Sequence, residues 1–310
     1  MSALVTIGIP CFNSARWIKA AVDSALGQDW PAKEIIVVDD GSTDGSHEIL
    51  KDYGDAIRVI FAEHRGSNPA RNEVLRQSKG EWIQYLDADD FLLPEKISRQ
   101  FSEAGDCVCN IIYSPVLIDE NNTRRTSELD MNLDIYCQWL TWQLPQTGGC
   151  LWRKEALEKI GGWNEAMPCC QEHELYMRAL KTDLRFQYTP TPNAVYRIWS
   201  DETLCRKDKR LVMRVKTGLI DEMRAWMESR NLWNATSQDV AGQACFEMSR
   251  TFAQYDLDAA AAYHHARKAA GLIAVKGPAA PVAYRIVYSL AGFKPAEQVA
   301  NGIRSLRRKS

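Results

Sequence analysis

A short apolar run ends in a polar cluster at Ile35-Ile36-Val37-Val38-Asp39-Asp40-Gly41-Ser42. Two other stretches repeat this pattern, and they are Ile7-Gly8-Ile9-Pro10-Cys11-Phe12-Asn13 and Trp82-Ile83-Gln84-Tyr85-Leu86-Asp87-Ala88-Asp89-Asp90. The length, the β-branched content and the bounding turn residues of each run predict a buried strand. Because ligands bind at the carboxyl ends of strands in an open parallel sheet, we expect the three polar clusters to line one site.

Helical patterns separate these runs, so the chain alternates between strands and helices. Ser14 and Asn68 are expected to cap two of the helices, which run to about residues 28 and 78. This alternation predicts right-handed βαβ units and an α/β fold, with a mixed, mostly parallel sheet flanked by helices. From about residue 208 onward the pattern is helical. We therefore expect an α/β domain over residues 1–205 and a helical C-terminal region over residues 206–310.

Composition restricts the class of protein. The 310 residues carry a net charge of −2, which gives no reason to expect nucleic acid as a partner. No apolar stretch reaches the roughly 18 residues of a membrane span, and no secretory signal is expected at the amino terminus. Nine irregularly spaced cysteines favour a reducing compartment, hence the cytoplasm. We expect the close pairs Cys107/Cys109 and Cys169/Cys170 to be small buried side chains rather than metal or redox sites.

The acidic clusters suggest metal and nucleotide binding. Asp87 and Asp89 are hard oxygen ligands that suit Mg²⁺ or Mn²⁺ bridging to a diphosphate, although acidic turns of this kind are also common without a metal. A carboxylate at Asp39 or Asp40 would accept a hydrogen bond from a base N–H or a ribose hydroxyl. Arg71, in the first turns of a predicted helix, would attract a phosphate or hold one of the aspartates, unless it is a solvated surface residue.

Taken in order, these motifs resemble those of family 2 glycosyltransferases of the GT-A fold. The resemblance covers roughly residues 4–200 and includes two later segments, which are Gly161-Gly162-Trp163-Asn164-Glu165 and Gln171-Glu172-His173-Glu174-Leu175-Tyr176-Met177-Arg178. It implies an inverting enzyme, here expected to move a sugar from a UDP-sugar to a hydroxyl of a glycan or lipid-linked acceptor in cell-surface polysaccharide synthesis. It also implies a divalent metal, Mg²⁺ or Mn²⁺.

The resemblance assigns roles to individual residues. Glu172 matches the general base, and Asp89 with Asp87 matches the metal site. The nucleotide-sugar-binding positions would be Pro10, Phe12, Asn13, Asp39, Asp40, Arg71, Asp87 and Ala88. The alternative for Glu172 is an exposed acid at the start of a helix, where the helix dipole favours negative charge, and Glu174 is a weaker candidate for the base.

Two departures from the family pattern leave other functions open. Trp199 stands where the family often has a metal-ligating histidine, and Phe12 stands where it has tyrosine. One alternative is a sugar nucleotidyltransferase, which would need a glycine-rich loop that residues 11–15 lack. The other is a catalytically silent member that binds a nucleotide sugar or a glycan, against which the retained acids at 87, 89 and 172 argue.

The C-terminal segment is basic. Residues 276–310 contain seven Lys or Arg and one acid, Glu297. Residues 285–290 and 303–309 combine apolar and basic side chains, as a helix at a membrane surface would. We expect either peripheral contact with the inner face of the membrane or a packed helical cap with a solvated basic end.

Overall fold

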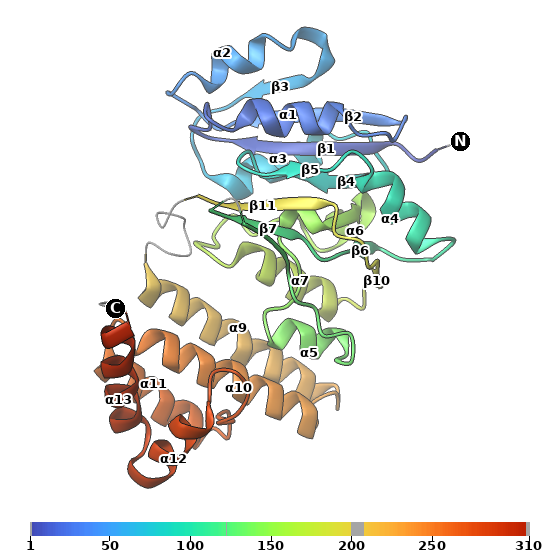
Figure 1. Cartoon of the computed structure of the whole chain (residues 1–310). Coiled ribbons are helices and arrows are strands. Elements are labelled where there is room, and N and C mark those ends of the chain that lie inside the picture. The colour runs from blue at the N-terminus through green and yellow to red at the C-terminus, as the bar shows by residue number, and fades with distance from the viewer. Residues whose placement is uncertain (1, 122, 200–207, 308–310) are drawn as a thin grey trace. The chain divides into compact units, whose positions relative to one another are not determined.

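The computed structural model of the chain describes residues 2–121, 123–199 and 208–307 (Figure 1). Its contacts divide the chain into two compact units. The first comprises Met1–Asp130 and Gln143–Thr203, and the second comprises Met131–Trp142 and Leu204–Ser310. The boundary expected at residues 205 and 206 lies outside the described residues. Grouping of Met131–Trp142 with the C-terminal helices was not expected from the sequence.

A seven-stranded sheet forms the centre of the first unit, in the order β10-β6-β9-β4-β1-β2-β3. The strands β3, β2, β1 and β4 run parallel, whereas β9 is antiparallel to both β4 and β6. The prediction of a mixed, mostly parallel α/β sheet is therefore confirmed. The strands span β1 Val5–Cys11, β2 Lys33–Asp39, β3 Arg58–Phe61, β4 Trp82–Tyr85, β6 Ile111–Tyr113, β9 Cys150–Arg153 and β10 Phe186–Tyr188.

A second, four-stranded sheet has the order β5-β11-β7-β8. Its strands are β5 Phe91–Leu92, β11 Ala194–Ile198, β7 Leu117–Glu120 and β8 Thr123–Thr126. The sequence predicts one strand over residues 107–118, but the chain makes two there, β6 and β7, which belong to different sheets. The second sheet matters for the site because β5 follows Asp90 directly and β11 ends beside Trp199.

Helices cover the central sheet. They are α1 Ile18–Leu26, α2 Ser46–Lys51, α3 Ser67–Gln77, α4 Lys96–Ala104, α6 Lys154–Lys159 and α7 Gln171–Lys181, with the short 3₁₀ helices η1 Gly54–Ala56 and η2 Thr147–Gly149. Helix α3 lies very close to β1, since a Cβ built on Gly8 would stand 2.2 Å from the Val74 side chain. Glycine at this position of the strand lets α3 approach, and α3 is the helix that carries Arg71.

Two expected helix caps are wrong. The Ser14 hydroxyl donates to the carbonyl of Phe12, and α1 begins only at Ile18. The Asn68 amide donates to the carbonyl of Asn164, while α3 begins at Ser67. Ser14 therefore bonds within its own turn, and Asn68 ties α3 to the loop at Asn164.

The cysteine prediction is partly wrong. A disulfide joins Cys107 and Cys109, and Cys107 is only half-buried. Cys169 and Cys170 are buried, as expected.

The second unit is helical, as expected for the C-terminal region. It contains α5 Ile135–Leu140, α9 Lys209–Ser229, α10 Ala235–Phe252, α11 Leu257–Ala269, α12 Val282–Ala291 and α13 Phe293–Arg307. Asp208, Asn234 and Asp256 each cap a helix by accepting a backbone N–H three residues later. Its core includes Phe246, Phe252, Ala260, Tyr284 and Phe293. No helix in the described ranges is both long and apolar enough to cross a membrane.

Candidate active site

Three neighbouring strands deliver the polar clusters to one edge of the sheet. Strand β1 lies between β4 and β2, and Cys11 is paired in register with Asp39. The Asp40 N–H donates to the Cys11 carbonyl at 2.8 Å, and the Leu86 N–H donates to the Gly8 carbonyl at 3.0 Å. The turns that follow β1, β2 and β4 therefore start side by side, as the apolar runs in the sequence predict.

The adjacent acids Asp39 and Asp40 differ in the number of hydrogen bonds that their carboxylates accept from the protein. The carboxylate of Asp40 accepts the backbone N–H groups of Arg65 and Gly66 at 2.9 and 2.8 Å, and His64 Nδ1 lies 2.8 Å from it. Among the described residues, Asp39 accepts one short hydrogen bond, from the Ser42 N–H at 2.9 Å, while His47 Nδ1 is 3.7 Å from its other oxygen. Asp40 thus holds the 64–66 loop, and Asp39 keeps an oxygen for a ligand.

Phe12 presents an aromatic face next to these acids. Its side chain is 42% exposed, and its ring stacks on His64 with centroids 3.9 Å apart. Asn13 takes the left-handed backbone conformation at φ 46°, and its side-chain oxygen accepts the Thr43 N–H at 2.8 Å. Pro10 is buried within β1. Pro10 and Asn13 shape the turn, whereas Phe12 is the side chain that a flat ligand can contact.

Arg71 links three parts of the site. The guanidinium, which is 5% exposed, donates to Asp87 Oδ1 at 2.6 Å and to Gln171 Oε1 at 3.1 Å. It also lies 4.5 Å from the Trp163 ring centroid. Of the roles considered from sequence, the geometry is that of an arginine that holds an aspartate rather than a solvated surface residue.

The turn after β4 concentrates negative charge. Burial and the neighbouring Asp87 raise the pKa of Asp89, and burial and Asp89 raise the pKa of Asp90 well above its usual value. Asp90 accepts the Arg197 N–H at 2.8 Å, and Ala88 is buried between the flanking acids. Because charged carboxylates crowd here, a cation bound at the turn would be favourable.

Asp87 and Asp89 fit a divalent cation that is shared with a ligand. They supply hard oxygen donors, but the described residues contain no ready-made cluster of three or more His, Cys, Asp or Glu ligands. Trp199 Nε1 donates to Asp89 Oδ2 at 2.8 Å, so the indole that replaces a histidine competes for one of these oxygens. The remaining metal positions would have to be filled by oxygens of a diphosphate or by water.

Glu172 lies in the first turn of α7 and is half-buried. Its Oε1 accepts a hydrogen bond from the Thr147 hydroxyl at 2.8 Å. The preceding residue, Gln171, bonds Arg71, so a continuous line of contacts connects Asp87 to the start of the helix that carries Glu172. Glu174 instead forms an ion pair with Arg178 at 2.7 Å. This pairing agrees with Glu174 being the weaker candidate for the general base.

Several residues that complete the site were not singled out from the sequence. They are His64, Thr147, Trp163, Gln171 and the buried Asp90. The sequence signal was present for Trp163, Gln171 and Asp90, since all three fall in the quoted motifs. His64 lies in a loop and Thr147 begins the short η2, and neither has a local sequence pattern.

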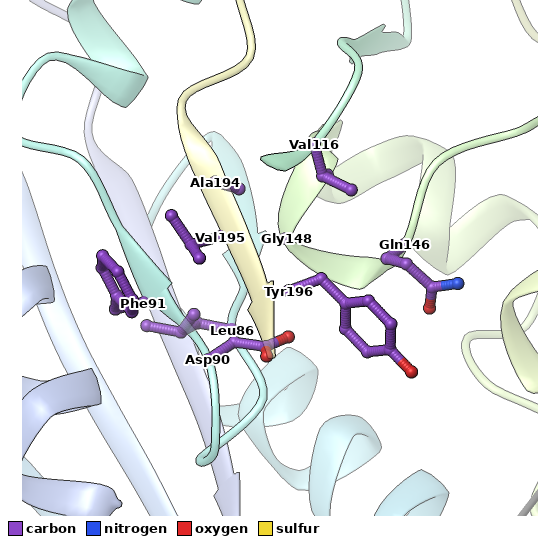
Figure 2. A pocket seen from close by; sticks show the side chains of 9 residues that line it. All are labelled: Leu86, Asp90, Phe91, Val116, Gln146, Gly148, Ala194, Val195 and Tyr196. Atoms are coloured by element: carbon purple, nitrogen blue, oxygen red, sulfur yellow. The ribbon is translucent and has the colours of Figure 1, made fainter. Parts of the chain in front are cut away.

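A small hollow adjoins the acidic turn (Figure 2). Figure 2 shows the side chains of Asp90, Tyr196 and Gln146 beside apolar ones such as Val195 and Leu86. Its empty volume of about 180 Å³ includes space that is open to solvent, so little of it is enclosed by the protein. The hollow is therefore too small for a nucleotide sugar.

Comparison with known families identifies the chain. Residues 6–161 match the sequence model of glycosyl transferase family 2. The chain belongs to glycosyltransferase family 2. The resemblance inferred from the motifs is thereby confirmed, and with it the assignment to a family of transferases.

Curated relatives of this family 2 glycosyltransferase carry similar names. An uncharacterized glycosyltransferase of Rickettsia felis is 34% identical over 189 residues, which are 57% of this chain and 31% of that protein. The putative teichuronic acid biosynthesis glycosyltransferase TuaG of Bacillus subtilis is 37% identical over 115 residues, which are 36% of this chain and 46% of that protein. The chain thus spans about a third to a half of these relatives.

Solved structures share the fold across the whole chain. The S. aureus TarS fragment 1–349 in complex with UDP-GlcNAc superimposes with a TM-score of 0.68 at 15% identity, covering 99% of this chain and 92% of that one. The mannosyltransferase PcManGT from Pyrobaculum calidifontis, in complex with GDP-Man and Mn²⁺, gives 0.57 at 19% identity, covering 100% and 89%. These similarities confirm the GT-A fold.

Proposed function

We propose that this family 2 member is an inverting glycosyltransferase that moves a sugar from a UDP-sugar to a hydroxyl of a glycan or lipid-linked acceptor. The observation that carries the proposal is the line of contacts from Asp87 through Arg71 and Gln171 to the helix of Glu172. This line connects Asp87, which is suited to a metal-bound diphosphate, with the helix that carries Glu172, which is suited to act as a base.

In the proposed reaction, the acceptor oxygen bonds to the anomeric carbon as the bond from that carbon to the diphosphate oxygen breaks. Glu172 takes the proton of the acceptor hydroxyl. The Thr147 hydroxyl holds Oε1 of Glu172, which orients the carboxylate and leaves Oε2 for the proton. Attack from the side opposite the leaving group inverts the anomeric configuration.

Other residues would bind the donor. Asp39 accepts from the base or the ribose, and the exposed ring of Phe12 contacts the base. Asp87 and Asp89 would hold Mg²⁺ or Mn²⁺, which when bound supplies positive charge to the departing diphosphate. Arg71 keeps Asp87 in place.

The comparisons support the substrate class by analogy. TarS was solved with UDP-GlcNAc and with UDP, and TuaG is named for teichuronic acid biosynthesis. We accordingly propose UDP as the nucleotide and cell-surface polysaccharide synthesis as the setting. The proposed compartment is the cytoplasm, supported by the odd number and irregular spacing of the cysteines, although the Cys107–Cys109 disulfide is a feature that is rare there.

A catalytically silent nucleotide-sugar-binding protein is the second candidate. The hydrogen bond from Trp199 to Asp89 favours it, because that bond competes with a metal for the carboxylate.

Nucleotide binding and sugar transfer test these two candidates in turn. We expect UDP and UDP-sugars to raise the thermal unfolding temperature more with Mn²⁺ than without it, and Asp89→Ala to abolish the Mn²⁺-dependent part. Failure of every nucleotide sugar to bind, with or without Mn²⁺, would refute the proposal.

Glu172→Gln separates catalysis from binding. The variant should still bind UDP-sugar, whereas transfer should slow by roughly 10²–10⁴-fold through loss of the base. Glu155→Gln, on an exposed position of α6, is the matched control and should transfer at the wild-type rate. Full transfer by Glu172→Gln would remove Glu172 from the mechanism, and a product with retained anomeric configuration would contradict inversion.

A further inference from the structure

Helix α12 has an apolar face that the described structure leaves exposed. Val282, Ile286 and Leu290 are spaced four residues apart and are 63%, 55% and 83% exposed. Residues at this spacing lie on one face of a helix. We call these three residues the α12 stripe. Tyr284 is buried in the core of the helical unit, so α12 is anchored through a different face.

The neighbouring helix also carries exposed apolar side chains. Helices α12 and α13 pack against each other within the helical unit (Figure 1). On α13, Val299 and Ile303 are 49% and 50% exposed, while Phe293 and Ala296 are buried in the core. Exposed apolar groups on two packed helices are typical of surfaces that bind a partner or a membrane.

The charge around the α12 stripe indicates which partner is favoured. Residues 276–296 contain no Asp or Glu, and Arg285 lies exposed on α12 between members of the stripe. Glu297, which is fully buried, pairs with Arg250 and Arg304, at 2.5 and 2.8 Å. Its charge is therefore compensated inside the helical unit and does not oppose an anionic surface.

Some of the basic residues in this segment are also paired. Lys276 pairs with Asp239 and Lys294 pairs with Asp258. Among the described basic side chains of this segment, Arg285 is exposed and makes no ion pair, and the sequence ends with three more basic residues, Arg307, Arg308 and Lys309. An apolar stripe flanked by basic side chains suits the boundary between lipid headgroups and acyl chains of an anionic bilayer.

We propose that the α12 stripe, with Val299 and Ile303, binds the surface of an anionic lipid bilayer. The contact is peripheral, with the apolar side chains entering the headgroup region and Arg285 contacting anionic headgroups. This binding does not depend on the transfer reaction, so it can be tested independently of the proposed function.

Vesicle co-sedimentation of the full chain tests the proposal. The vesicles contain phosphatidylcholine alone or phosphatidylcholine mixed with phosphatidylglycerol. We expect binding to the mixed vesicles, and a partition coefficient roughly ten-fold lower for Ile286→Asp, which places a charge within the stripe. Arg285→Gln should bind several-fold more weakly, and the difference should shrink in high salt.

Val108→Asp is the matched control. Val108 is 79% exposed in the α/β unit, so the substitution changes hydrophobicity and charge in the same way at a different place. It should bind mixed vesicles as the wild type does. Urea unfolding of all variants should match the wild type, because the substituted side chains are exposed.

Three outcomes would overturn the proposal. The first is no binding of the wild type to the mixed vesicles, and the second is equal loss of binding in Val108→Asp and Ile286→Asp. The third is concentration-dependent dimerisation of the wild type that Ile286→Asp abolishes while vesicle binding is unaffected, since a second copy of the chain would then cover the stripe. UDP binding measured on the same samples reports on the proposed function independently.

Discussion

Replacing Asp87 by asparagine should destabilise the α/β unit, because it removes the carboxylate that pairs with the guanidinium of Arg71. The two groups are 2.6 Å apart, and Arg71 is 5% exposed. Removing one partner of a buried ion pair leaves the other charge uncompensated, which costs about 3–5 kcal/mol. Because Asp87 is 26% exposed and Arg71 retains Gln171 as an acceptor, we expect the low end of that range.

A loss of about 3 kcal/mol corresponds to a fall of roughly 150-fold in the folding equilibrium constant. Asp89→Asn should have the opposite sign. Burial and the neighbouring Asp87 raise the pKa of Asp89, so its charge opposes folding at neutral pH. The neutral amide removes this penalty, and its oxygen can still accept the Trp199 N–H.

Urea unfolding at pH 7 without metal, followed by tryptophan fluorescence, measures both effects. The midpoint of the α/β unit should fall for Asp87→Asn and rise for Asp89→Asn. Asp55→Asn, at an exposed position in η1, should leave the midpoint unchanged. Both site variants should lose Mn²⁺-dependent UDP binding.

The reasoning would be refuted if Asp87→Asn were as stable as the wild type, or if Asp89→Asn lost a comparable amount of stability. Either result would mean that the charges at this turn are balanced differently from what the contacts indicate.

Three further variants test other parts of the structure. Trp199→Phe removes the N–H that Asp89 accepts but keeps an aromatic ring, so Mn²⁺ should bind about five-fold more tightly in the presence of UDP by calorimetry; unchanged or weaker binding would contradict competition at this oxygen. Burial lowers the pKa of Lys96 to about 7. Above that pH the folded protein has released a proton that the unfolded chain still holds, so the free energy of unfolding should rise by roughly 2 kcal/mol between pH 7 and 9. Lys96→Met should be more stable at pH 7 and lose that rise in urea titrations at the two pH values; the same pH dependence in both proteins would exclude Lys96 as its source. Asp40→Asn should lower the free energy of unfolding by about 2 kcal/mol through a lost acceptor for backbone N–H groups, whereas Asp39→Asn should mainly weaken UDP binding; the reverse pattern would overturn their assigned roles.

The sheet and the placement of the site could be predicted because both depend on local patterns. Strands β1, β2 and β4 are buried on both faces, which gives continuous apolar runs that stand out in the sequence. Polar residues that directly follow such runs must then lie at one edge of the parallel sheet. The sequence also predicts a helix over residues 171–181, and these are the bounds of α7.

Other features depend on distant parts of the chain and have no local signal. Helix α4 buries Lys96 and Gln100, so its buried face does not appear in the sequence as a row of apolar residues. Nothing near β9 specifies that it inserts antiparallel between β4 and β6. The different availability of Asp39 and Asp40 is set by the 64–66 loop, some 25 residues later.

The assignment of Met131–Trp142 to the helical unit limits how this enzyme can be divided. Cys137, Trp139 and Leu140 of α5 are fully buried, and α5 packs against α10 within that unit. A protein cut after residue 205 would retain α5 but lose its packing partner, leaving an indole and a leucine in water at about 1.5–3 kcal/mol each. An exchange of C-terminal regions between relatives would need to carry this twelve-residue insert along with the tail, so the two pieces are expected to be inherited together.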